Sequence, residues 1–236
     1  MKRSIVAVVL LLLAAAPAAA QRHGRHRGGD PADHALRLRV GGFVPEGDSS
    51  YWDEKALDFT GGAEDMDDLS FGLDYRLDVT PHFSLLFGGT AFTGETDQHY
   101  IDFTDEFGDD IEHTTSLDIT SLTLGATFHF TGPEAVIRPY VGAGGGLYSY
   151  SFEESGDFID FNPPPEEIFS GTFIAEGETF GYYLLAGLEV PVSRSVALFA
   201  EGRWQRAEDE LGDDFEGFGD LDLSGRDIAA GLTWRF

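Results

Sequence analysis

Ten charged residues occupy alternate positions in segments that are otherwise apolar or small and polar. They are six arginines and four carboxylates: Arg37, Arg39, Arg76, Arg138, Arg203, Arg235, Asp74, Asp78, Glu189 and Glu201. Guanidinium and carboxylate groups form charge-assisted, often bidentate hydrogen bonds. Charges that are removed from water must be paired. If the strand face that carries these residues is enclosed, we expect an Arg–carboxylate network that blocks the interior and joins neighbouring strands. A narrow proton or ion path is the alternative.

Other site chemistries have weaker support in the sequence. The chain contains no cysteine, which excludes disulfides and thiolate metal sites. The glycines from Gly142 to Gly146 lack the G-x-G-x-x-G spacing of a dinucleotide loop. His99, His113 and His129 have no convincing serine partner. We therefore expect no catalytic residues, no metal site and no cofactor, and predict that the protein is not an enzyme.

The charge of the chain is strongly negative, at −27. A surface of that sign argues against nucleic acid as a partner. The acidic clusters do not meet the EF-hand spacing, but clustered carboxylates bind divalent cations weakly. A solvated, mutually repulsive rim is the alternative explanation for them.

The elements that position the charged residues are predicted strands, because apolar residues recur with a period of two. Eight such segments occur, at 34–44, 69–79, 83–93, 117–130, 136–150, 180–190, 196–205 and 228–236. In the fourth segment, Leu117 and Ile119 are out of phase with the apolar residues that follow. A bulge near Thr120 and Ser121 would reconcile the two phases.

Long and short connections alternate strictly between these strands. The long segments 46–68, 94–113, 151–178 and 207–222 hold 33 of the 42 acidic residues, with Lys55 as their one basic residue. Pro163 to Pro165 argue against a strand in the third of them. The alternation of long and short connections predicts an all-β fold: an eight-stranded antiparallel up-and-down transmembrane β-barrel with long acidic extracellular loops and short periplasmic turns. Aromatic residues within the acidic segments predict either a lid over the barrel mouth or an adhesive surface.

Three features place the apolar face of the barrel toward lipid. The polar face is rich in glycine, serine and threonine, which suits a crowded lumen. Aromatic residues gather near strand ends, as in interfacial girdles. The chain also begins with a basic, then apolar segment that ends in Ala18–Ala20, the pattern of a secretory signal peptide. A soluble, lipocalin-like barrel with the apolar face inside is the alternative.

The domain organisation follows from these segments. We predict a signal peptide at 1–20 that is cleaved near Ala20 after Sec-type export, a disordered periplasmic arm at 21–33 and the barrel at 34–236. The final strand closes the barrel against 34–44. Its apolar face is formed by Ile228, Ala230, Leu232, Trp234 and Phe236.

Two segments resemble small bacterial outer-membrane barrels of the OmpW-like and OmpA-type superfamily. One is the strand from Ile137 to Tyr148, IRPYVGAGGGLY, and the other is the closing strand with its terminal Phe236. The resemblance implies a location in the bacterial outer membrane, contact with its lipid and lipopolysaccharide, and recognition by the barrel-assembly machinery through the C-terminal strand. It also implies passage of small hydrophobic molecules.

Together these observations predict an outer-membrane barrel with a structural or interaction role, a plugged charged lumen and acidic outer loops. A narrow channel or carrier for small solutes is the alternative.

Overall fold

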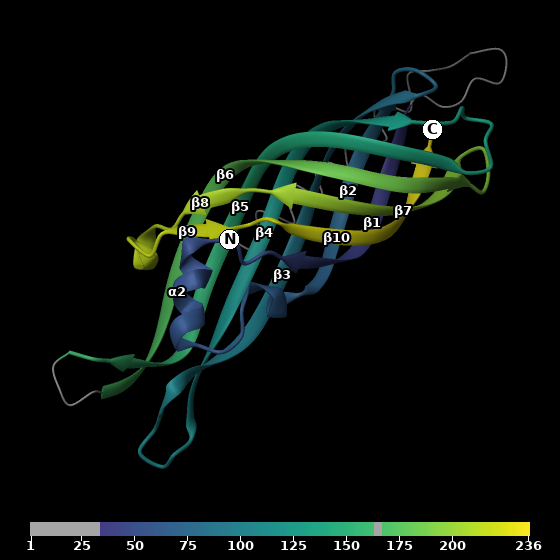
Figure 1. The fold of residues 1–236 in the computed structure, drawn as a ribbon. Coiled ribbons are helices and arrows are strands. Elements are labelled where there is room, and N and C mark those ends of the chain that lie inside the picture. Colours follow the sequence, from purple (N-terminus) through teal and green to yellow (C-terminus); the bar gives the residue numbers. More distant parts are fainter. Residues whose placement is uncertain (1–33, 163–166) are drawn as a thin grey trace.

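A computed structural model describes residues 34–162 and 167–236. Eight of its strands form a closed antiparallel barrel in the order β1-β10-β7-β6-β5-β4-β3-β2 (Figure 1). Their bounds are β1 His34–Pro45, β2 Asp68–Asp78, β3 Phe83–Thr104, β4 Asp110–His129, β5 Arg138–Asp160, β6 Glu167–Pro191, β7 Val196–Arg206 and β10 Gly225–Arg235. The predicted signal peptide, the arm at 21–33 and Pro163 to Pro165 lie outside the described residues. The predicted all-β fold, an eight-stranded antiparallel up-and-down barrel, is confirmed.

Closure depends on the pairing of the first and last strands. β1 and β10 are paired from Ala35↔Arg235 to Pro45↔Gly225 without a register shift. The ring therefore has no open edge at this level, which is a requirement for strands that cross a bilayer. The shorter barrel strands, such as β2 and β7, have 11 residues each, enough for a tilted strand to cross.

The connections differ from the predicted long loops. β3 and β4 pair as far as Thr104↔Asp110, and β5 and β6 as far as Asp160↔Glu167. Two of the acidic segments are therefore mostly continuations of strands, and both hairpins project beyond the barrel (Figure 1). Alternation is hard to recognise there because serine, threonine and acidic residues occupy most outward positions.

The other two acidic segments fold over the same end of the barrel. The first contains the helix α2, Ser50–Asp58, and the 3-10 turn η1, Ala63–Met66. The second contains the short strands β8, Glu208–Glu210, and β9, Asp220–Asp222, which pair around η2, Asp213–Phe215. None of the helices in the described residues is long and apolar enough to span a membrane.

The predicted bulge near Thr120 and Ser121 is wrong. β4 pairs with β5 from His113↔Gly156 to His129↔Tyr140 in one unbroken register. Leu117 and Ile119 point inward, like Thr123 further along β4, and are buried. They are apolar because the interior is apolar at that level, so the phase of the pattern changes while the backbone stays regular.

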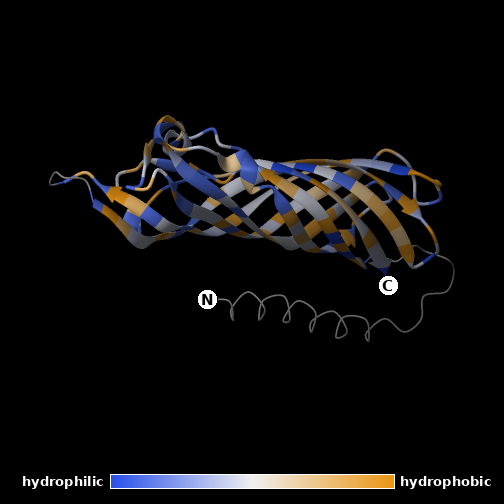
Figure 2. Cartoon of the chain, turned by 90° about the horizontal axis from the view of Figure 1, so that it is seen from below, coloured by the Kyte–Doolittle hydropathy of each residue, from blue (hydrophilic) through white to orange (hydrophobic). Residues whose placement is uncertain are grey.

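The two faces of the barrel have opposite character. Outward-facing side chains at the level of the charged lumen form an exposed apolar surface, and hydrophobic and hydrophilic residues alternate along the strands (Figure 2). Among these exposed residues are Leu38, Phe71, Leu124, Leu184, Leu198 and Ile228. Near the short turns, polar residues and glycines face inward together with a small apolar cluster of Leu86, Tyr140, Tyr183 and Leu185. Near α2, the inward-facing residues are aromatic or aliphatic.

Glycines on the inner face make room for large side chains. A Cβ on Gly144 would lie 2.6 Å from both the Leu124 carbonyl oxygen and the Tyr183 hydroxyl oxygen. The small residues of the predicted polar face therefore complement the tyrosines that fill the lumen.

We predict that Gly144→Ala lowers the free energy of unfolding by about 2 kcal/mol, because an added methyl group overpacks the lumen. Gly202→Ala is the matched control, since a Cβ there meets no atom within 4 Å. The denaturant midpoint of protein refolded in detergent measures both effects. Equal midpoints for the two variants would show that the lumen is loosely packed.

Candidate functional site

The first half of the lumen site is centred on the carboxylate of Glu201 in β7. Arg37 of β1 donates to Glu201 Oε2 at 2.9 Å, and the Tyr140 hydroxyl of β5 donates to the same oxygen at 2.9 Å. Arg39 and Arg203 reach Glu201 Oε1 at 3.5 and 3.4 Å. One carboxylate therefore joins side chains from three strands on different sides of the barrel.

Aromatic rings support the arginines of this centre. The Arg37 guanidinium lies 4.1 Å from the centroid of Phe199, and the Arg203 guanidinium lies 4.2 Å from that of Tyr183. Stacking of this kind satisfies the faces of guanidinium groups that carboxylates cannot reach. The rings also fill the space between the charged groups.

The second half is centred on Glu189 of β6, nearer the short turns. Arg76 donates to Glu189 Oε2 at 2.7 Å, and Arg138 to Oε1 at 2.8 Å. Arg235 of β10 also pairs with Oε1, and the Thr233 hydroxyl donates to Oε2 at 3.1 Å. Asp78 lies at the edge of this centre, with an oxygen 2.9 Å from Arg76 Nε.

The structure thus gathers the six arginines, Glu189, Glu201 and Asp78 into two centres. Asp74 is the exception: it is buried in the lumen, and within the described residues it forms no ion pair. Its Oδ2 atom has no hydrogen-bond partner there.

Five polar or aromatic contributors to the lumen were not predicted: Ser70, Tyr140, Tyr183, Asp227 and Thr233. Asp227 lies 3.8 Å from Arg39 and accepts a hydrogen bond from Ser70 at 3.0 Å. Extending the polar face of the final strand one step back from Ala229 would have found Asp227. Tyr140 and Tyr183 contact charged groups on other strands across the lumen. The alternation predicts which residues face inward but not which of them meet.

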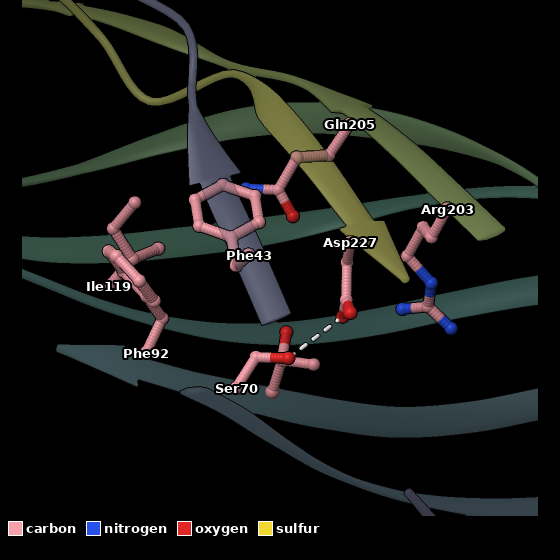
Figure 3. A pocket seen from close by; sticks show the side chains of 8 residues that line it. Phe43, Ser70, Phe92, Ile119, Arg203, Gln205 and Asp227 are labelled. Atoms are coloured by element: carbon pink, nitrogen blue, oxygen red, sulfur yellow. Dashed lines mark hydrogen bonds between the residues drawn. The ribbon is translucent and has the colours of Figure 1, made fainter. Parts of the chain in front are cut away.

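A small cavity lies where the charged lumen meets the apolar mouth. It has a volume of about 10 Å³ and is lined by Phe43, Ser70, Thr90, Phe92, Ile119, Arg203, Gln205 and Asp227 (Figure 3). That volume holds roughly one water molecule.

The mouth of the barrel is filled by an apolar cluster. α2 inserts Tyr51 and Trp52, and η2 inserts Phe215, against Phe152 and its neighbours. The Tyr51 and Phe152 rings lie 5.1 Å apart, edge to face. The described residues thus place part of the acidic segments as a lid, while Phe107, Phe161 and Phe218 remain exposed. The adhesive surface stays a prediction.

Lys55 has a structural position inside this lid. Its ammonium group lies 2.6 Å from Glu154 Oε1 and 4.0 Å from the Phe59 ring centroid. Burial lowers the pKa of Lys55, while the attraction of Glu154 opposes that shift. Tyr51 donates its hydroxyl to the same carboxylate, and burial raises the pKa of that phenol.

The histidines of the described residues have no serine partner. Within the described residues, no serine is hydrogen-bonded to a histidine; His99 Nδ1 lies 3.0 Å from the Thr60 hydroxyl. Nor does a cluster of three or more histidine or acidic side chains there form a metal site. His113 is enclosed by Phe59, Tyr100 and Phe158, and neither ring nitrogen has a hydrogen-bond partner in the described residues.

We predict that Glu201→Ala lowers the free energy of unfolding by about 3 kcal/mol or more, because three buried arginines lose their shared partner. Glu46→Ala is the control: Glu46 accepts from the exposed Arg226 at 3.0 Å, and such surface pairs contribute less than about 1 kcal/mol. Chemical denaturation in detergent compares the variants. Similar losses would contradict a stabilising role for the Glu201 centre.

We also predict that the lid loosens on acidification. Burial, together with the nearby Lys55 charge, lowers the pKa of His113 from 6.5 to about 4. Between these values the native state binds fewer protons than the unfolded state, so stability falls as pH falls. The loss is at most about 1.4 kcal/mol for each pH unit.

Fluorescence of the buried Trp52, in a background with Trp204→Phe and Trp234→Phe, measures this loosening between pH 7 and pH 4. His113→Phe keeps an aromatic ring but removes the titrating group, so its signal should depend less on pH. Identical pH profiles would show that His113 does not cause the transition.

Comparisons with known proteins agree with the architecture. No protein-family model matches the chain, and no curated protein matches it. The crystal structure of Neisserial surface protein A (NspA) is similar at 12% identity, covering 88% of this chain and 100% of that one, with a TM-score of 0.53. The solution structure of Outer Membrane Protein W from E. coli matches at 16% identity, covering 89% and 100%, with a TM-score of 0.45. The likeness to NspA shows a shared fold, that of a closed antiparallel β-barrel.

Proposed function

We propose that this chain is an outer-membrane β-barrel with a closed lumen and a structural or interaction role at the cell surface. The observation that carries this proposal is the pair of carboxylate centres, in which Glu201 and Glu189 each bind three arginines across the lumen. Side chains that are held by several ion pairs do not move aside readily for a solute.

The outer surface supports insertion into a bilayer. At the short-turn end, exposed aromatic residues include Phe83, Phe128, Phe130 and Trp234. Tyr182 and Trp204 pack together toward the other end, with ring centroids 5.9 Å apart. Two aromatic zones that flank an apolar belt are the pattern of interfacial girdles.

The distribution of acidic residues supports an orientation with the long hairpins outside the cell. The four acidic segments lie at the end opposite the three short turns, which would face the periplasm. In this orientation the acidic residues lie at and beyond the level of lipopolysaccharide. We propose lipid and lipopolysaccharide as contacts of the barrel, Sec-type export with cleavage near Ala20, and assembly through the C-terminal strand.

A narrow channel or carrier is the second candidate. The unpartnered oxygens of Asp74 and Asp227, together with the water-sized cavity, favour it, because they would provide polar steps for a proton or small ion. The apolar cluster above the cavity opposes it, since an ion that crosses Phe92, Tyr148 and Phe152 would lose its hydration.

Single-channel current across a planar bilayer separates the two functions. We predict current at background for protein whose folding has been checked by a heat-dependent gel shift, because the lumen is blocked by paired charges and an apolar lid. A general porin added to the same bilayer shows that the membrane can report conductance. Steady, discrete openings of the folded protein would overturn the closed-lumen proposal in favour of the channel.

A further inference from the structure

One strand of the β5–β6 hairpin has an incompletely covered edge. β6 pairs with β5 from Glu167 to Glu189. It pairs with β7 only from Tyr182 onward. The part of β6 before Tyr182 projects past the barrel (Figure 1). Its second side contacts η2 and β8 but forms no strand ladder with them.

The chain covers much of this second edge with side chains. The backbone N–H of Ile174 donates to Asp214 Oδ2 at 3.0 Å, and that of Glu176 donates to Asp213 Oδ2 at 3.2 Å. The Thr179 hydroxyl donates to the Glu208 carbonyl at 2.8 Å. η2 therefore covers the backbone edge of β6 at Ile174 and Glu176, and β8 contacts β6 at Thr179.

Two of the other projecting strands have local contacts at their edges. The N–H of Thr60 donates to the His99 carbonyl of β3 at 3.0 Å. The N–H of Ile159 in β5 donates to the Tyr100 hydroxyl at 3.2 Å.

Five residues of β6, Ile168 to Thr172, lack such cover in the described part of the chain. Backbone groups in a strand point alternately to its two sides. Since the N–H groups of Ile174 and Glu176 point away from β5, those of Ile168, Ser170 and Thr172 do so too. No described residue outside the hairpin forms a hydrogen bond to these three backbone groups.

The side chains around this edge combine apolar and acidic character. Ile168 is 43% and Phe169 41% exposed, on opposite faces of the hairpin. Asp157 and Glu167 flank the edge, and Asp157 accepts from the Ser170 hydroxyl at 2.6 Å. The sequence has no lysine or arginine between Arg138 and Arg194. The edge thus offers hydrogen bonds, apolar contacts and an unopposed negative charge.

We propose that the edge of β6 from Ile168 to Thr172 docks an extended polypeptide segment that carries lysine or arginine between apolar residues. The segment adds to the hairpin as a further strand, and its backbone bonds to Ile168, Ser170 and Thr172. Its basic side chains face the carboxylates, whereas a second copy of this chain would bring like charges together. Such a segment would be the partner in the proposed interaction role. Its access to this edge rests on the proposed orientation, in which the hairpins lie outside the cell.

The test uses a labelled decapeptide that alternates lysine and valine, with full-length protein refolded in a nonionic detergent. Fluorescence anisotropy measures the dissociation constant. Ser170→Pro removes the central N–H of the edge and places a ring in the docking path, so we expect affinity to fall about tenfold or more. Ser170→Ala keeps the N–H, so its affinity should stay within about twofold of wild type.

A second peptide with the same sequence, methylated on alternate backbone nitrogens, separates strand addition from attraction by charge alone. It has the same charge but cannot complete the ladder, and we expect it to bind as weakly as the first peptide binds Ser170→Pro. Equal binding of both peptides, or equal binding by Ser170→Pro and wild type, would overturn the proposal. The heat-dependent gel shift checks that each variant is folded. Because binding is measured in detergent, failure here leaves the conductance result and the closed-lumen proposal untouched.

Discussion

The structure depends on one constraint: charges that are enclosed by a narrow barrel must find partners inside it. Six arginines enter the lumen, and two glutamates each bind three of them. These contacts join β1, β2, β5, β6, β7 and β10, so most of the ring is connected through its interior as well as through its backbone. The desolvation cost of such groups is large, and their net contribution to stability depends on how completely they are paired. The tyrosine and threonine hydroxyls that also contact the glutamates, and the rings that stack on the arginines, make that pairing more complete.

The same constraint explains the small residues of the inner face. A barrel of eight strands is only wide enough for its side chains to fill it. Two clusters of three arginines, with Tyr140 and Tyr183 beside them, need neighbours without side chains. Gly144 lies against Tyr183, and Gly187 lies against the ring of Tyr140. The glycine pattern and the charge pattern are therefore two consequences of a filled lumen.

The sequence was sufficient to predict the parts of the fold that follow from a period of two. The eight strands, their closure by β10 and the inward direction of the ten charged residues all follow from which residues alternate. Strands β3, β4, β5 and β6 continue beyond their predicted ends, and this was not predicted. The outward-facing residues in these continuations are polar or acidic, so the apolar residues between them are difficult to recognise as one face of a strand. The helix α2 was missed because its buried residues are only Tyr51 and Trp52, and their partners Phe152 and Phe215 lie far away in sequence. Asp74 fell on the correct face, but no pattern in the sequence shows that it stays outside the ion pairs.

The polarity of single strands reverses along their length, and this reversal argues for where a membrane would lie. In β4, Leu122 and Leu124 point outward, whereas Leu117 and Ile119 point inward. In β5, Val141 and Leu147 point outward, whereas Tyr148, Tyr150 and Phe152 are buried inside. A strand in water needs an apolar interior, and a strand in lipid needs an apolar exterior. A change from one to the other without a break in register is what a barrel needs if its lower part is in lipid and its upper part is in water. The change occurs near Ser121 in β4 and near Tyr148 in β5, and these two residues are paired directly across the strands. These two neighbouring strands therefore agree on the boundary between the proposed membrane span and the capped hairpins above it.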